Sequence, residues 1–169
     1  ELIPKRITVG GVQRVLQNLL NERVSIRDLP TILEGISEAC AVTQSLMVIT
    51  EHVRSRLSRQ ISNAAAGSDG VIPLVTLSGE WEQHFAESLT GQGEEKTLAL
   101  PPSLIQKFIL RVRQVFEEQG SRGESPVLLT SPGVRPYVRS IIERFRPSTV
   151  VISQNEIHPR AKIRTVGQI

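Results

Sequence analysis

The chain has 169 residues, of which 39% are hydrophobic and only 4% aromatic, enough for one ordinary domain or two small ones around an aliphatic core. Its net charge of +3 is unevenly distributed, because residues 125–169 hold seven Lys and Arg against two Asp and Glu. This basic end could contact an acidic partner or could simply be exposed to solvent. No apolar run approaches the roughly 20 residues that cross a bilayer, and a single cysteine excludes an internal disulfide, so we expect a soluble chain from a reducing compartment.

The beginning of the chain, ELIPKRI, shows no charged region followed by an apolar stretch, and so no signal peptide. The only methionine is Met47. We therefore expect the sequence to be a piece of a longer protein.

Two amphipathic helices are predicted within residues 7–42. Apolar residues recur at helical spacing over 12–20 and again over 29–40, on either side of a break at 21–25. So short a connection predicts that the two helices pack as a hairpin. The outward face is polar, mixed in charge and without a nucleophile beside a base, so we expect it to contact another protein. Its residues are Gln13, Arg14, Gln17, Asn18, Arg23, Arg27 and Glu34.

Both helices have a candidate capping residue. Thr8 is expected to cap the first by accepting a hydrogen bond from an early backbone N–H. The second has two possible starts, because Ser25 with Asp28 also fits the spacing of a capping box. We favour Asp28 as the cap, since this start places Pro30 in the first turn, where its missing N–H breaks no helical hydrogen bond.

A third helix is predicted over residues 45–65, with Arg54, Arg56 and Arg59 pointing largely outward. The segment AAAGSDG (64–70) then combines small residues with helix breakers and is the best domain boundary in the chain. We expect a helical subdomain at 1–69 and an α/β subdomain at 70–169, with modest contacts between them.

Strands and helices alternate after this boundary. The fold class predicted is α+β, in which the N-terminal helical subdomain is followed by a small α/β subdomain with a mixed sheet and at least one parallel pair of strands. Pro73 cannot donate to a sheet, so its strand is expected near an edge. The predicted strands are 71–77, 98–100, 127–130, 150–152 and 162–166, and the predicted helices are 78–89, 102–119 and 133–145.

The residues that carry chemistry do not form a recognisable catalytic, metal or cofactor motif. The three histidines, His52, His84 and His158, lack a second ligand at metal-binding spacing, and no phosphate-binding glycine loop or nucleophile elbow is present. The turn TSPGVRP leads into a helix beside Arg135, which is a weak signal for an anion site. We therefore predict no enzyme activity, no metal and no cofactor.

A basic nucleic-acid-binding module is the alternative function, because seven basic residues follow one another in the last part of the chain. Their spacing places them around a helix rather than in one stripe, which argues against it. These residues are Arg135, Arg139, Arg144, Arg146, Arg160, Lys162 and Arg164.

Two separated stretches carry a family resemblance. GGVQRVLQNLLNERVSIRDLPTILEGISE (10–38) closely resembles the cytoplasmic part of the large export-gate protein of flagellar and type III secretion systems, the FHIPEP family. PVLLTSPGVRPYVRSIIERF (126–145) and then SQNEI (153–157) resemble the last segment of the same family, more the flagellar than the virulence branch. Residues 43–124 match in outline, and Pro30 departs from the residue usual in the family.

This resemblance implies a non-enzymatic piece of an export gate at the cytoplasmic face of the bacterial inner membrane. Members of the family have a membrane-embedded N-terminal half and a cytoplasmic half that assembles into a nonameric ring, which receives export substrates, their chaperones and other export-apparatus proteins. No nucleic acid is expected as a partner. The family's chaperone-docking residues fall upstream of this chain. Because the resemblance is densest at the joint of the first two helices, we predict a protein interface at Arg23, Arg27 and Asp28.

Overall fold

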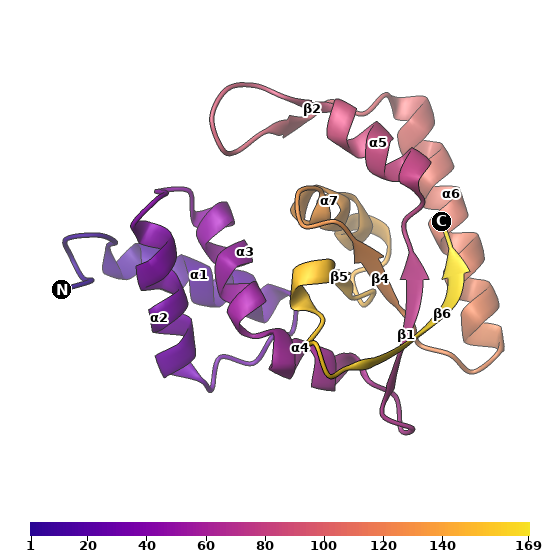
Figure 1. Ribbon diagram of the computed structural model, residues 1–169. Coiled ribbons are helices and arrows are strands. Elements are labelled where there is room, and N and C mark those ends of the chain that lie inside the picture. Colours follow the sequence, from indigo (N-terminus) through magenta and orange to yellow (C-terminus); the bar gives the residue numbers. More distant parts are fainter.

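The computed structural model describes residues 1–169, as helices around a central sheet (Figure 1). None of the helices is both long and apolar enough to cross a membrane. The helices are α1 (Val9–Asn21), α2 (Leu29–Cys40), α3 (Leu46–Arg56), α4 (Ser58–Ala65), α5 (Gly79–Glu87), α6 (Pro102–Ser121), α7 (Arg135–Phe145) and the short 3-10 helix η1 (Gln154–Glu156). The strands are β1 (Val71–Thr76), β2 (Leu89–Thr90), β3 (Thr97–Leu98), β4 (Val127–Thr130), β5 (Val151–Ser153) and β6 (Lys162–Gln168).

Four strands form a parallel sheet in the order β5-β4-β1-β6. The antiparallel pair β2–β3 is separate from it. The predicted α+β class is therefore confirmed, and the parallel and antiparallel pairings of the expected mixed sheet lie in two different sheets. The predicted positions of the strands and of the helices after residue 70 agree with the structure to within a few residues.

The two faces of the parallel sheet pack against different sets of helices. Leu128 of β4 and Val151 of β5 point into a core shared with α5, α6 and α7. Their neighbours Val127 and Ile152 point the other way, into a core shared with α1 to α4. Parallel sheets are normally covered on both faces, and here the N-terminal helices cover one of them. The expectation of modest contact between residues 1–69 and 70–169 is therefore wrong.

The N-terminal helices are arranged around α3. The main contacts of α1 and of α2 are with α3 and not with each other, so the predicted α1–α2 hairpin is wrong. The predicted third helix is in fact two, because Leu57 leaves the helical conformation with φ −97° and ψ 19°. The break turns α4 toward β1 and η1, so that Ile61 joins the same core (Figure 1). Thr8 and Asp28 cap α1 and α2 as predicted.

Strand β1, predicted near an edge from Pro73, lies next to the edge strand β6 but is itself inside the sheet, between β4 and β6. The β4 ladder begins only at Leu74, one residue after the proline. On the β4 side of β1, no residue is paired with Pro73, so the N–H that proline lacks leaves no hydrogen bond unmade there. On the other side β1 pairs with β6 from Val71 onward.

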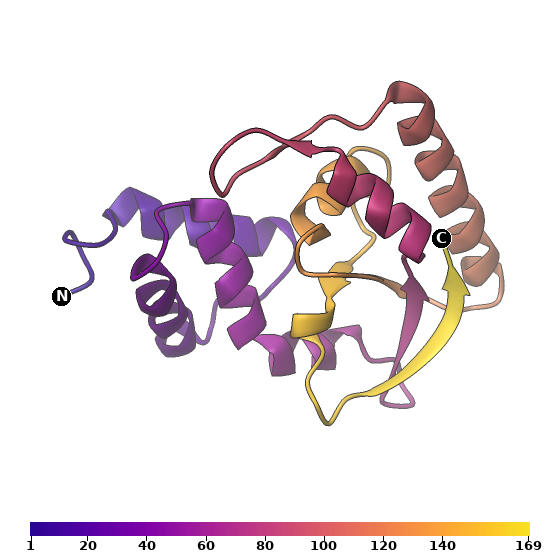
Figure 2. The same cartoon turned by 45° about the horizontal axis from the view of Figure 1, so that its top comes forward.

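The β2–β3 hairpin reaches across from the sheet layer to the top of α3, and both views show it bridging the two halves of the molecule (Figures 1 and 2). The Ser45 hydroxyl donates a hydrogen bond to Glu95 Oε1 at 2.6 Å, and the Thr43 hydroxyl donates to Glu94. Ser45 is also the cap of α3. The hairpin loop is thus tied to the beginning of that helix.

Candidate functional site

Six charged side chains meet where the N-terminal helices join the sheet layer. They come from four segments of the chain that are far apart in sequence, and they comprise three arginines and three glutamates, so their formal charges balance. The six residues are Glu22 at the end of α1, Glu51 and Arg54 of α3, Arg135 and Arg139 of α7, and Glu156 of η1. We call this set the junction network.

Arg135 is the centre of the junction network. Its Nη1 and Nη2 donate to the two carboxylate oxygens of Glu22 at 2.8 and 2.9 Å. Its Nε and Nη2 donate to the two oxygens of Glu51 at 2.7 and 2.8 Å. Nη1 also donates to the carbonyl of Val151 at 2.9 Å. One buried guanidinium therefore ties α7 to the end of α1, to α3 and to β5.

Arg54 and Glu156 form the second pair of the network, and their side chains are both 2% exposed. Arg54 Nε and Nη2 donate to the two oxygens of Glu156 at 3.0 and 2.8 Å. Glu156 also accepts from the backbone N–H of Ser153, which completes a capping box for η1. The backbone carbonyl of Glu156 accepts from the Ser62 hydroxyl of α4. The carboxylate of Glu156 is thus held from both halves of the chain.

Arg139 lies beside this pair, and one of its buried N–H donors makes no hydrogen bond. Its Nη1 donates to the carbonyls of Pro147 and Thr149 at 3.3 and 3.0 Å. Its Nε lies 3.6 Å from Glu22 Oε1 without a hydrogen bond, and Arg54 Nη1 lies 3.8 Å from the same oxygen. Both of these buried nitrogens lack a hydrogen-bond partner.

Glu22 and Arg135 hold each other in the ionised form. Burial by itself raises the pKa of the Glu22 carboxyl, but Arg135, with Arg54 and Arg139, outweighs burial and brings that pKa below its ordinary value. Burial lowers the pKa of Arg135, and Glu51 and Glu22 outweigh it, so the guanidinium pKa lies well above its ordinary value. A buried ion pair of this kind is costly to break, because removing one member leaves the other buried and unpaired.

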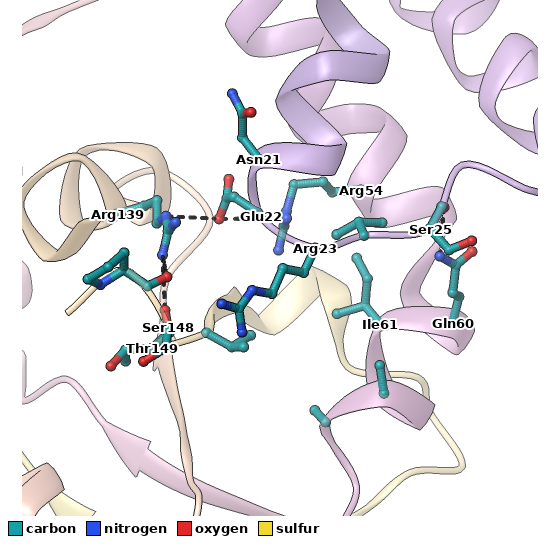
Figure 3. A pocket seen from close by; sticks show the side chains of 15 residues that line it. Asn21, Glu22, Arg23, Ser25, Arg54, Gln60, Ile61, Arg139, Ser148 and Thr149 are labelled. Carbon is teal, nitrogen blue, oxygen red and sulfur yellow. Dashed lines mark hydrogen bonds and ion pairs between the residues drawn. The ribbon is translucent and has the colours of Figure 1, made fainter. Parts of the chain in front are cut away.

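Two hollows border the junction network. One, of about 350 Å³, lies between the end of α1, α4 and the 147–150 loop, and its charged residues are Glu22, Arg23, Arg54 and Arg139 (Figure 3). We call it the junction cavity. The other, of about 440 Å³, is lined by residues of α1, α3 and α7 and by Glu95 of the β2–β3 hairpin loop, and it includes Glu51, Arg135 and Arg139. No group of three or more His, Cys, Asp or Glu side chains is placed to hold a metal ion.

A model of the FHIPEP family matches residues 1–162. The chain belongs to the FHIPEP family. It is 62% identical over 169 residues to the flagellar biosynthesis protein FlhA of Caulobacter vibrioides, a match that covers all of this chain and 24% of that protein. It is 33% identical to the protein of the same name from Bacillus subtilis, over all of this chain and 25% of that protein. The chain therefore spans about a quarter of the length of these relatives.

Solved structures of family members have the same fold. The Chlamydia pneumoniae CdsV protein superposes with a TM-score of 0.90 at 31% identity, over 99% of this chain and 48% of that one. CdsV in its complex with CdsO gives 0.88 at 32% identity, over 98% and 48%. The nonameric EscV cytosolic domain of a type III secretion system gives 0.81 at 26% identity, over 98% and 48%. The resemblance drawn from residues 10–38 and 126–157 is thereby confirmed.

The three residues predicted as a protein interface lie in the connection between α1 and α2, and all three are exposed. Asp28 accepts a hydrogen bond from the N–H of Thr31 and so has a structural role as a cap. Arg27 is not among the residues that line the junction cavity. Arg23 does line that cavity (Figure 3). The structure thus separates Arg23 from Arg27, although the two are close in sequence.

The prediction that Arg54 points outward is wrong, because its residue surface is only 1% exposed. The sequence also gave no role to Glu22, Glu51 and Glu156. The one available signal was the spacing of Arg135 and Arg139, four residues apart beside the apolar Val138, which places both on the inner face of α7. Partners for buried arginines would then have to be acidic residues elsewhere in the chain.

The basic residues expected to follow a nucleic acid do not assemble into one surface. Arg135 and Arg139 are buried in the junction network, so the turn before α7 is not an anion site either. Arg164 pairs with Glu124 at 3.0 Å. Arg146 lies over the Phe116 ring and donates to Thr149 Oγ1. These contacts leave no phosphate-tracking stripe.

Proposed function

We propose that this chain is part of a flagellar protein-export gate, in which it acts as a non-enzymatic structural and docking module. The observation that carries the proposal is the 62% identity over the whole chain to a flagellar biosynthesis protein. The fold supports it, since the same architecture occurs in a domain whose name describes a nonamer in a type III secretion system. On this proposal the chain works at the cytoplasmic face of the bacterial inner membrane.

The junction network suits such a role because it joins two differently built halves into one body. Arg135 alone donates hydrogen bonds to residues of α1, α3 and β5. A ring subunit must present fixed surfaces to both of its neighbours, since each contact repeats around the ring. We propose that the network keeps the N-terminal helices and the sheet layer at one angle, so that the surfaces of both remain in register.

The proposed partners are neighbouring copies of the same protein in a nonameric ring, export substrates, their chaperones and other proteins of the export apparatus. The solved complex of CdsV with CdsO supports the last of these classes. For ring contacts, we propose the exposed connection between α1 and α2, with Arg23 and Arg27 as its charged residues and Asp28 as the residue that fixes its shape.

A chimera tests the proposed function. The matching segment of the Caulobacter vibrioides protein is replaced by this chain, and motility and flagellin secretion are measured in a strain without its own copy. We expect secretion to be restored, because 62% identity over the whole segment preserves the fold. A chimera that is present at the normal level in the membrane but exports nothing would overturn the proposal.

A second chimera, with Arg23→Glu and Arg27→Glu together, tests the proposed ring contact. Both residues are exposed, so the fold should persist, while like charges placed at an interface should weaken export. The matched control is Arg122→Glu, an exposed arginine at the end of α6. Normal export by the double variant would remove the α1–α2 connection from the proposal.

A further inference from the structure

The wall of the junction cavity holds more basic than acidic side chains. Arg23, Arg54 and Arg139 line it with a single carboxylate, Glu22, and of these arginines Arg54 is also paired with Glu156, which does not line the cavity. The Glu22 carboxylate is already engaged by both Nη atoms of Arg135 from outside the cavity. We propose that the cavity is a binding site for a carboxylate, and that its occupant is an acidic side chain of a partner protein with an apolar residue beside it.

Two hydrogen-bond donors in the wall of the cavity point to such a ligand. Arg54 Nη1 and Arg139 Nε are buried and have no acceptor within the chain. The two side chains are 2% and 10% exposed, and Figure 3 shows their guanidinium groups on either side of the Glu22 carboxylate. A buried donor without an acceptor is costly, and donors on charged groups form the strongest hydrogen bonds. A carboxylate in the cavity reaches both donors once the two guanidinium groups turn from Glu22 Oε1, which lies 3.6 Å from Arg139 Nε and 3.8 Å from Arg54 Nη1.

Arg23 adds an independent argument, because its backbone is in the left-handed region with φ 60°. The N–H of Arg23 bonds to the carbonyl of Leu20, and the N–H of Val24 bonds to that of Leu19. This pattern is a Schellman motif, in which the position of Arg23 is usually a glycine. Strained residues of this kind cluster at functional sites. The Arg23 side chain extends along the cavity toward Ser148 (Figure 3).

The remaining walls explain why the occupant has an apolar neighbour. Aliphatic side chains from both halves of the chain face the charged wall, and the cavity is large enough for more than a single carboxylate group. These residues are Val24, Ile61, Ala64, Ala65, Pro147 and Val150. A free inorganic anion leaves this surface unused, whereas a glutamate next to a leucine covers both kinds of wall. The charge and the shape of the cavity therefore favour a peptide segment.

The inference does not rest on the proposed function, because all residues that line the cavity belong to this chain. The probe is the capped peptide acetyl-Leu-Glu-Leu-amide, whose only charge is the glutamate, titrated into the 169-residue chain at constant ionic strength. Nitrogen–proton NMR spectra should show saturable shifts at the Nε–H of Arg139 and at the backbone amides of residues 22–25 and 147–150. The matched peptide acetyl-Leu-Gln-Leu-amide should produce no such shifts.

Arg23→Gly is the decisive variant, since glycine adopts φ 60° without strain and the fold is kept. We expect it to weaken binding of the glutamate peptide roughly tenfold, the effect of losing one charged hydrogen bond. Arg27→Ala, in an exposed arginine outside the cavity, should leave the affinity unchanged. Equal binding of the two peptides, or absence of shifts around the cavity, would overturn the site. Unchanged affinity in Arg23→Gly would remove Arg23 from it.

Discussion

Replacing Arg135 by methionine tests the energetic role of the junction network. Methionine keeps a long side chain in the space of the arginine but removes its charge and all of its donors. Four hydrogen bonds to two carboxylates are lost, with lengths between 2.7 and 2.9 Å. The hydrogen bond to the Val151 carbonyl is lost as well.

The size of the effect follows from what happens to the two carboxylates. Glu51 has a side chain that is 22% exposed, so water can replace much of what Arg135 gave it. Glu22 is 17% exposed, and its other arginines lie at 3.6 and 3.8 Å, beyond hydrogen-bonding contact. Most of the cost therefore falls on Glu22. Removing one partner of a buried ion pair typically costs about 3–5 kcal/mol, and we expect Arg135→Met to lose that amount.

The assay is urea unfolding followed by circular dichroism, with Arg56→Met as the matched control. Arg56 also donates to a glutamate, Glu34 at 3.1 Å, but its side chain is 41% exposed. Exposed ion pairs contribute little, so the control should lose less than about 1 kcal/mol. In the double variant Glu22→Gln, Arg135→Met, the losses should be far from additive, because no unpaired carboxylate remains at that position. Equal small losses for Arg135→Met and Arg56→Met would refute the reasoning.

Three further predictions concern single positions. Because the folded-state pKa of Glu22 is lowered, the contribution of Glu22 to stability is complete above the ordinary glutamate pKa of about 4.3 and is lost as the pH falls through the lower folded value. The free energy of unfolding should therefore decline below about pH 4.3. Urea titrations at several pH values should show this decline, and a less steep one in Glu22→Gln. Arg23→Gly should stabilise the chain by about 1 kcal/mol in the same assay, because it relieves a left-handed residue, and a loss of stability would contradict the strain inferred at φ 60°. Gly11→Ala should lower the thermal midpoint, since the new methyl group would lie 2.6 Å from Cγ1 of the buried Ile7, and an unchanged midpoint would mean that Ile7 moves at no cost.

The features that sequence reasoning predicted correctly are those set by local chemistry. Thr8 and Asp28 cap their helices through contacts three residues away, and Pro30 accordingly lies in the first turn of α2. The strand–helix alternation after residue 70 was also visible, because buried parallel strands are short continuous apolar runs. The family could be identified because residues 10–38 form a long match.

The errors have a common physical origin, which is that tertiary contacts overrode local patterns. Arg54 was predicted to point outward because the inward positions of its helix were assigned to apolar residues. Its partner Glu156 is 102 residues away in sequence, and the partners of Arg135 are 84 and 113 residues away. A helical pattern shows which face is apolar but not which distant carboxylate will neutralise an arginine.

The missed helix packing and the underestimated contact between residues 1–69 and 70–169 follow from the same cause. Residues 64–70 are small and polar and so resemble a linker, yet the chain crosses from α4 to β1 within one continuous core. The alternate residues of β4 and β5 face two different sets of helices, and only the three-dimensional arrangement shows that one set is the N-terminal half.

Two residues of the chain can report whether the junction network makes the two halves unfold as one cooperative unit. Cys40, the only cysteine, is buried in the N-terminal half, and burial raises the pKa of its thiol, so it should react with a thiol reagent only after that half opens. Trp81, the only tryptophan, packs against Phe108 in the other half, with ring centroids 5.2 Å apart. Urea unfolding followed by pulsed labelling of Cys40 and by Trp81 fluorescence should give one coincident transition. Two transitions at different urea concentrations would show that the halves unfold separately and that the junction network does not unite them.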